Sequence, residues 1–175
     1  MNFDLDDLDY NAWKKSIQGN GNLIRKIIPK GIVRRNDRVK IALIDCSLET
    51  PEGSILRRCL LLGRKSVVIV PVLLSKHDKL TYTIMVEQRR IVNGGITVEF
   101  PAGEIGKTDG PKEAAVKEII EETNIDITAD KLIQLNNNPI LVSPGYTYNP
   151  VYFFYFIKNV NNTLLKEFDA KKTGI

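Results

Sequence analysis

Histidine, tryptophan and cysteine are scarce in this chain, which contains one His, one Trp and two Cys among 175 residues. The single histidine, His77, lies in a charged segment between two strand-like runs, so a histidine-based catalytic triad has no convincing base. Cys46 and Cys59 are not a close pair, and each lies in a largely apolar run. We therefore expect two buried free thiols in a reducing compartment.

Long hydrophobic runs and nucleic-acid-binding motifs are also absent from the sequence. No stretch approaches the roughly 20 apolar residues of a membrane-spanning helix. The four aspartates among the first ten residues argue against a secretory or organelle-targeting peptide. The net charge of +4 could attract nucleic acid or steer a small anionic substrate, but no arginine-rich run, zinc-binding pattern or ribonucleoprotein motif is present. We expect a cytoplasmic protein that binds neither membranes nor nucleic acid.

The length and the hydrophobic content of 43% fit one main domain with a small appendage. Residues 1–62 are expected to form a small β-rich N-terminal lobe, residues 63–65 a junction, and residues 66–175 the main domain. The elements expected are a short amphipathic helix at 10–17 and strands at 39–46, 54–62, 66–75, 80–86, 96–100, 131–135 and 151–157. Pro71 predicts a bulge or an edge position in the strand at 66–75.

A stretch from Gly94 to Ile127 combines a strand, a glycine-rich loop at 101–110 and an acidic helix. Pro111 suits the first helical position, because its missing N–H costs nothing there, and Gly110 can serve as the N-cap. Asn124 tolerates the left-handed conformation in which helices often end. The sequence therefore predicts a short helix that begins at Pro111 and ends near Asn124.

Three glutamates, Glu118, Glu121 and Glu122, are spaced i, i+3 and i, i+4 on this helix. Like charges at these spacings destabilise a helix by about 0.2–0.5 kcal/mol per pair, and the helix dipole disfavours anions near its C-terminal end. A divalent cation such as Mg²⁺ would remove both penalties by binding the carboxylate oxygens. The alternative is a solvated helix face, in which Lys117 balances the charges of Glu113 and Glu121.

The loop and helix together resemble the signature of the Nudix hydrolases. The chain reads Gly103, five residues, Asp109, seven residues, and then Lys-Glu-Ile-Ile-Glu-Glu-Thr-Asn-Ile at 117–125. The spacing and the three helix glutamates match the family, whereas Asp109, Lys117 and Asn124 replace its Glu, Arg and Gly. Asp109 and Lys117 could still form a supporting ion pair, although Lys lacks the bidentate geometry of Arg.

Flanking segments are similar to those of ADP-ribose and ADP-sugar pyrophosphatases within this superfamily. These segments are Glu-Gln-Arg-Arg at 87–90, Glu-Phe-Pro-Ala-Gly at 99–103 and Ser-Pro-Gly at 143–145. The resemblance implies an α/β (α+β) fold, the Nudix-type α/β/α sandwich with a mixed sheet, and a homodimer that the N-terminal lobe helps to form. Family members usually continue into a further strand and helix, so we expect a chain that is cut short or that closes its sheet differently after Leu164–Lys172.

The resemblance also implies an enzyme, a Nudix pyrophosphohydrolase. Such enzymes hydrolyse the diphosphate of a nucleoside diphosphate sugar, for example ADP-ribose or an ADP-sugar, to AMP and a sugar phosphate with Mg²⁺ or Mn²⁺. The implied metal ligands and catalytic groups are Glu118 and Glu122, with Glu121 assisting and the Ala102 carbonyl completing the metal site.

Three further residues are implied to bind substrate. Arg90 would hold a phosphate, Glu99 belongs to the matching Glu-Phe-Pro-Ala-Gly segment, and Tyr146 could stack on a base or sugar. A surface salt bridge for Arg90 and simple packing for Tyr146 are the alternatives.

The sequence differs from these relatives at one position that matters for catalysis. Many of them carry a glutamate shortly after Ser-Pro-Gly that binds metal or positions water, and this position falls near Asn149. A neutral amide can orient water but cannot accept its proton. Glu104 or Glu121 could replace the missing acid, or the chain could be a catalytically weak Nudix domain that binds a nucleotide or a protein. A third hypothesis is that the protein hydrolyses another Nudix substrate, such as a dinucleoside polyphosphate or an oxidised nucleotide.

Overall fold

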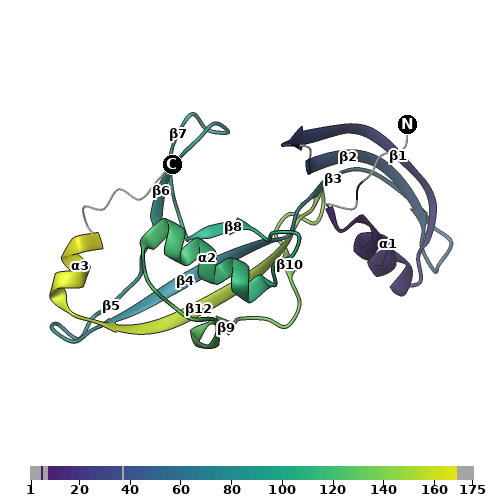
Figure 1. Ribbon diagram of the computed structural model, residues 1–175. Coiled ribbons are helices and arrows are strands. Elements are labelled where there is room, and N and C mark those ends of the chain that lie inside the picture. The colour runs from purple at the N-terminus through teal and green to yellow at the C-terminus, as the bar shows by residue number, and fades with distance from the viewer. Residues whose placement is uncertain (1–4, 6–7, 37, 169–175) are drawn as a thin grey trace. The chain divides into compact units, whose positions relative to one another are not determined.

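The computed structural model describes residues 5, 8–36 and 38–168, which form two compact units (Figure 1). The first unit comprises Met1–Lys65 and Ile140–Val151, and the second comprises Ser66–Pro139 and Tyr152–Ile175. The chain changes unit after Lys65, and the segment 140–151 associates with the first unit. The expected domain bounds stay a prediction. Most of the aspartate-rich start and the end of the expected C-terminal connection lie outside the described residues.

The first unit is a sheet with one helix on it. Helix α1 (Tyr10–Gly19) precedes three antiparallel strands, β1 (Leu23–Arg35), β2 (Arg38–Glu49) and β3 (Ile55–Gly63), and β11 (Thr147–Tyr148) pairs parallel with β3. The core side chains are Leu5, Leu8, Trp13, Val39, Ala42, Ile44, Cys46 and Leu62. The structure confirms the expected helix at 10–17 and the strands at 39–46 and 54–62.

Strand β1 was not expected from the sequence. Its residues include Pro29, Gly31 and several Lys and Arg, which mask the alternation of a half-buried strand. The strand lies at the end of its sheet's strand order, and edge strands tolerate proline and charged residues.

The thiol prediction was half wrong. Both cysteines are free and Cys46 is buried, but Cys59 is exposed because it lies opposite the outward-facing Asp45 of β2. None of the helices in the described residues is long and apolar enough to cross a membrane.

The second unit is built on strands β4 (Ser66–Ser75) and β12 (Pro150–Val160). The first two residues of β12 belong to the first unit. Strands β5 (Thr81–Tyr82) and β8 (Ala102–Glu104) pair with β4, and β9 (Ile133–Gln134) pairs with β12. Strand β10 (Ile140–Leu141) belongs to the first unit and pairs with Pro150 and Val151 of β12, which also belong to it. Strands β6 (Val86–Arg90) and β7 (Gly95–Glu99) form a separate hairpin. The helical elements are α2 (Pro111–Thr123), the short 3₁₀ turn η2 (Ala129–Lys131) and α3 (Asn162–Phe168). The molecule is therefore a mixed α+β fold, as expected.

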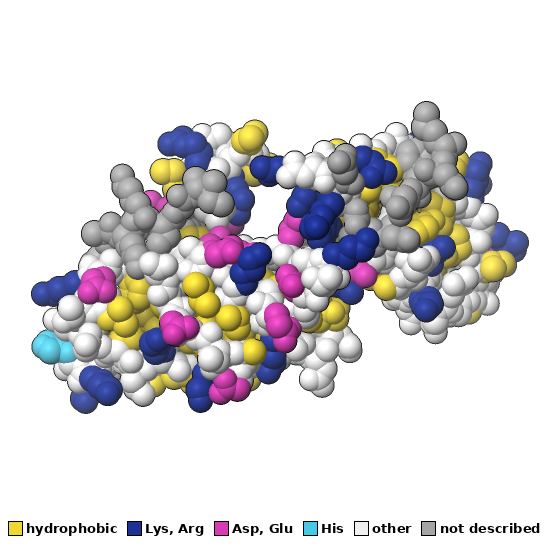
Figure 2. All heavy atoms as spheres, in the orientation of Figure 1, with side chains coloured by type: hydrophobic (Ala, Val, Ile, Leu, Met, Phe, Trp, Pro, Cys, Tyr) yellow, Lys and Arg dark blue, Asp and Glu magenta, His cyan; other side chains and the backbone are white. Residues whose placement is uncertain are grey.

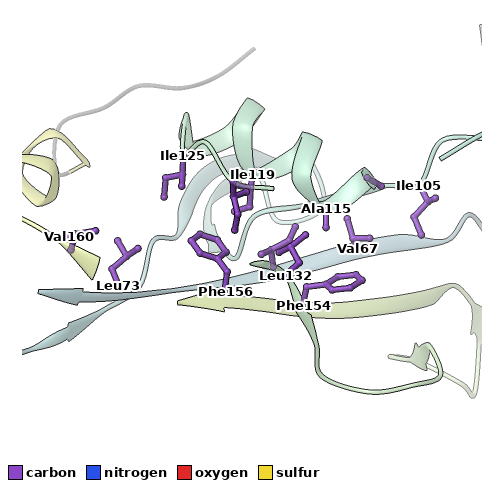
Figure 3. Close-up of a cluster of buried hydrophobic side chains, with 13 residues drawn as sticks. Val67, Leu73, Ile105, Ala115, Ile119, Ile125, Leu132, Phe154, Phe156 and Val160 are labelled. Atoms are coloured by element: carbon purple, nitrogen blue, oxygen red, sulfur yellow. The ribbon is translucent and has the colours of Figure 1, made fainter. Parts of the chain in front are cut away.

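Helix α2 covers one face of β4 and β12. Ala115 and Ile119 point from the helix toward Val67 of β4 and toward Phe154 and Phe156 of β12 (Figure 3). All five side chains are buried. This packing fixes the orientation of α2, and so it also fixes which of its residues point away from the core.

Some boundaries in the second unit differ from the prediction. The strand expected at 80–86 is shorter than predicted, because only Thr81–Tyr82 pair with β4 and the next strand begins at Val86. The loop at 101–110 contains the short strand β8, and 131–135 contains the end of η2 and two strand residues. Pro71 lies on β4 between the residues that pair with β8 and those that pair with β5, which explains how the strand accommodates a proline.

Candidate active site

The acidic helix forms as the sequence predicts. Gly110 is the N-cap in an extended conformation and Pro111 occupies the first helical position. Asn124 is left-handed at φ 59°, and its N–H donates to the Ile120 carbonyl at 2.9 Å. Since Ala115 and Ile119 face the core, the glutamates of this helix lie on its other sides, and Figure 2 shows acidic side chains gathered on the face that includes α2.

Glu118 lies directly against the loop that precedes the helix. A Cβ added at Gly103 would overlap the Glu118 carboxylate, closer than real Cβ atoms approach other atoms. Glycine at this position of β8 is therefore a steric requirement of the site, because only a residue without a side chain leaves room for the carboxylate.

Glu122 lies against the same strand one residue earlier. Its Oε2 accepts a hydrogen bond from the Ala102 N–H at 3.1 Å, and its Oε1 accepts one from Nε2 of Gln88 at 3.1 Å. The carboxylate is thus oriented from both sides, by the backbone of β8 and by a side chain of β6. The backbone at Ala102 and Gly103 consequently meets two helix carboxylates.

The ionised forms of both carboxyl groups are electrostatically disfavoured. Burial, followed by the charges of Glu122 and Glu121, raises the pKa of Glu118. Burial also raises the pKa of Glu122, although its hydrogen bonds from Ala102 and Gln88 partly oppose the shift. A nearby positive charge would favour the ionised form of each group.

This donor set fits a hard divalent cation. The described residues contain no group of three or more His, Cys, Asp or Glu side chains that could hold a metal. At this site the protein offers two carboxylates, those of Glu118 and Glu122, beside the backbone of β8. Mg²⁺ is commonly held by one or two carboxylates together with water and substrate phosphates. Coordination by the Ala102 carbonyl stays a prediction.

Glu121 has different surroundings. Its side chain is exposed and lies 4.0 Å from Nζ of Lys117, in the i, i+4 pair that the solvated-face alternative anticipates. Lys117 thus pairs with Glu121, and no ion pair in the described part of the chain joins it to Asp109. The Asp109 carboxylate instead lies against Gly106.

Arg90 and Glu99 form a two-point ion pair across the β6–β7 hairpin. Arg90 donates from Nε to Oε1 of Glu99 at 2.8 Å and from Nη2 to Oε2 at 2.6 Å. These bonds, joined by one from Thr97, lower the pKa of Glu99 to about 2. Arg90 therefore forms a salt bridge, the alternative role considered for it. Its positive charge also acts to lower the pKa of Glu122. Substrate binding by either residue stays a prediction.

Tyr146 and Asn149 belong to the first unit, whereas Glu104 lies on β8 in the second. Tyr146 is 74% exposed, and its backbone carbonyl accepts from the Leu61 N–H, whereas Tyr148 packs against the core of that unit. Asn149 is directed at Gly63, where an added Cβ would lie 3.1 Å from its Oδ1. Stacking of Tyr146 on a ligand stays a prediction.

Sequence reasoning missed Gln88, which stands in the Glu-Gln-Arg-Arg segment without an assigned role. Because alternate strand residues share a face, Gln88 lies on the same face as Arg90, and this spacing is the signal that could have identified it. Replacing Gln88 with Ala removes a side-chain hydrogen bond that orients Glu122. We expect a 10- to 100-fold loss of metal affinity or activity, as for other groups that orient ligands.

Mn²⁺ binding, followed by electron paramagnetic resonance, and kcat would measure this effect. Gln18→Ala, on an exposed position of α1, is the matched control and should leave both unchanged. Equal Mn²⁺ affinities of the Gln88→Ala variant and the wild type would show that Gln88 does not orient a ligand.

The Arg90–Glu99 pair predicts a small, pH-dependent contribution to stability. Because the pKa of Glu99 is lowered to about 2 in the folded protein, the pair stabilises the fold above the unfolded value of about 4.3. That contribution is lost as the pH falls toward 2. Glu99→Gln should therefore lower the unfolding free energy by at most about 1 kcal/mol at pH 7. Urea titrations at pH 7 and pH 3 should show a smaller difference between variant and wild type at the lower pH.

Comparisons with known proteins agree with this arrangement. The family model described as the NUDIX domain matches residues 63–172. Nudix hydrolase 14, chloroplastic, from Arabidopsis thaliana is 26% identical over 115 residues, which cover 61% of this chain and 37% of that protein. This chain thus spans little more than a third of the plant relative.

A solved structure, described as the "Crystal structure of ADP compounds hydrolase", has a TM-score of 0.57 and 19% sequence identity, with 78% of this chain and 67% of that chain covered. At that identity the likeness concerns the fold. The family match extends over more than half of the sequence and includes β8, α2 and their glutamates. The protein is therefore a member of the Nudix hydrolase family.

Proposed function

We propose that the protein hydrolyses the diphosphate of a nucleoside diphosphate sugar, such as ADP-ribose or an ADP-sugar, to AMP and a sugar phosphate. The observation that carries the proposal is the meeting of Glu118 and Glu122 with the Ala102–Gly103 backbone. Family membership supports the reaction class, since Nudix hydrolases act on small nucleotide substrates and generally use divalent metals. The Glu-Gln-Arg-Arg and Pro-Ala-Gly segments, together with the fold shared with an ADP compounds hydrolase, favour an ADP-containing substrate.

Each residue has a distinct part in the proposed reaction. Glu118 and Glu122 would hold Mg²⁺ or Mn²⁺, with Glu121 at the exposed side. The bound ion would neutralise phosphate charge and lower the pKa of water. Arg90 has five N–H donors, of which Glu99 engages two, so the remaining donors can bind a phosphate. Glu99 in this proposal orients Arg90. We also propose a cytoplasmic homodimer.

A panel of nucleotides tests the proposal. ADP-ribose, ADP-glucose, other nucleoside diphosphate sugars, a dinucleoside polyphosphate and an oxidised nucleoside triphosphate would be incubated with Mg²⁺ or Mn²⁺ and assayed for nucleotide products. Release of AMP from the ADP-sugars, at rates well above those for the other compounds, is the expected result. Faster turnover of a dinucleoside polyphosphate or an oxidised nucleotide would replace the ADP-sugar assignment with that substrate class.

A second candidate is a catalytically weak Nudix domain that binds a nucleotide or a protein partner. Asn149 favours it, because the relatives' acid falls near this position and the amide here lies against Gly63. Calorimetric binding of ADP-ribose without any product, with and without metal, would support this candidate and exclude the first.

A further inference from the structure

The chain contains the dipeptide Asn-Gly twice, at Asn20-Gly21 and at Asn93-Gly94. An asparagine that precedes glycine can lose its side-chain amide spontaneously, because glycine has no Cβ to shield the backbone nitrogen that attacks the amide carbon. Both asparagines are exposed. The hydrogen bonds around each amide, and not its access to water, therefore distinguish the two sites.

Asn93 lies in the turn between β6 and β7, a hairpin that projects from the rest of its unit (Figure 1). Its Oδ1 accepts a hydrogen bond from the Gly95 N–H at 3.0 Å, whereas no hydrogen bond in the described part of the chain holds its Nδ2. The Gly95 N–H thus points at the oxygen on which negative charge develops during attack, and such a donor stabilises that charge.

The nitrogen that would attack Asn93 belongs to Gly94. Its N–H donates to the Ile91 carbonyl at 3.2 Å, at the long end of the usual range. An added Cβ at Gly94 would meet nothing within 4 Å. Both reacting groups at this turn are therefore accessible and weakly held.

Asn20 has the opposite arrangement. Its Nδ2 donates to the Ser16 carbonyl at 2.9 Å, which fixes the amide against the last turn of α1, and no donor among the described residues contacts its Oδ1. The Gly21 N–H donates to the Gln18 carbonyl at 2.9 Å, and an added Cβ at Gly21 would lie 3.1 Å from the Pro51 ring. Both reacting groups are held at this site, and they have to be released before they can react.

We propose that Asn93 is a site of spontaneous deamidation, from which the structure protects Asn20. The Gly94 backbone nitrogen forms a bond to Cγ of Asn93, and the Cγ–Nδ2 bond breaks. The amide nitrogen leaves as ammonia with the proton that Gly94 gives up, and a cyclic succinimide remains. Water then opens the ring at either carbonyl carbon, which produces aspartate or isoaspartate. The isoaspartyl main chain runs through the side chain and gains a methylene, whereas the aspartyl chain keeps its length.

The isoaspartyl product changes the hairpin that carries part of the candidate site. Gly95 pairs with Arg90 directly beside the turn, and Gln88, which holds Glu122, lies on the same strand as Arg90. A longer turn without the Asn93–Gly95 hydrogen bond loosens this end of the hairpin, because two strands alone are marginally stable. The aspartyl product keeps an acceptor for the Gly95 N–H and leaves the hairpin intact.

Peptide mass spectrometry tests the modification. The full chain would be stored for several weeks at mildly alkaline pH and physiological temperature, beside a frozen aliquot, and digested with trypsin. Asn93 is the only asparagine in the tryptic peptide 91–107, and fragment spectra of the peptide 16–25 locate changes at Asn20. We expect Asn93 to convert at least about tenfold faster than Asn20, since each hydrogen bond that differs changes the rate several-fold. Equal conversion of the two sites, or faster conversion of Asn20, would overturn the proposal.

Hydrogen exchange tests the effect on the hairpin. The deamidated fraction, which gains a negative charge and is separated by ion exchange, would be compared with fresh wild type and with fresh Asn93→Asp, which contains only the aspartyl form. We expect several-fold faster exchange of the β6 and β7 amides in the deamidated fraction, and wild-type exchange in Asn93→Asp. Wild-type exchange in the deamidated fraction would refute the loosening of the hairpin. Neither measurement needs a substrate, so both outcomes are independent of the proposed hydrolysis.

Discussion

Glu118→Gln should lower kcat by more than about 100-fold while raising the melting temperature of the metal-free protein. Loss of a group that merely orients a metal ligand costs 10- to 100-fold, and Glu118 is proposed to be a ligand itself. The stability gain follows from the raised pKa of Glu118, because its ionised form is disfavoured in the folded protein by burial and by Glu122 and Glu121. Removing two like-charged pairs of about 0.2–0.5 kcal/mol each should raise Tm by about 1–3 °C.

The pH dependence of this gain has a definite sign. A carboxyl group with a raised folded pKa lowers stability progressively as the pH rises through that pKa. The Tm difference should therefore be largest at neutral pH and disappear below the unfolded pKa of about 4.3. Glu113→Gln, in the first turn of the same helix, is the matched control and should keep full activity. A Glu118→Gln variant with wild-type kcat would show that the carboxylate takes no part in the reaction.

Gly103→Ala should abolish most activity with little effect on folding. The added Cβ would occupy the position of the Glu118 carboxylate, which lies at the end of a flexible side chain and can rotate away at small cost. A carboxylate displaced by about 1 Å can lose about 100-fold in rate, so we expect at least that loss in kcat. Mn²⁺ affinity should fall together with kcat, whereas the urea midpoint should change little.

Gly31→Ala provides the comparison, because an added Cβ at that position meets nothing within 4 Å. Its activity and Mn²⁺ affinity should equal those of the wild type. Retention of wild-type turnover by Gly103→Ala would mean that the close approach of Glu118 to β8 has no functional importance.

The acidic helix could be predicted from sequence because its determinants are local. Pro111 fixes its start and Asn124 its end, and both act through the conformation of a single residue. The placement of Glu118 and Glu122 on one helix follows from the same local geometry. The approach of the two glutamates to Ala102 and Gly103 could not be predicted from local geometry, because it depends on how α2 packs on β4 through residues such as Ile119.

The hairpin residues show where sequence reasoning fails. Arg90 and Glu99 are nine residues apart, and only the β6–β7 register brings them together. The strand expected at 80–86 ended before Gln88 and Arg90, whereas both lie on β6, where alternate residues share a face. The exposure of Cys59 was likewise set by strand register, which an apolar run does not reveal.

The chain crosses between its two units more than once, which limits how the protein can be divided into fragments. The backbone passes from one unit to the other after Lys65, after Pro139 and again after Val151. Strand β11 depends on β3 for its hydrogen bonds, so a fragment that starts at Ser66 would carry an orphaned strand and the unsatisfied peptide groups that accompany it. The first unit is thus interleaved in sequence with the second, and excision or exchange of one would have to include part of the other.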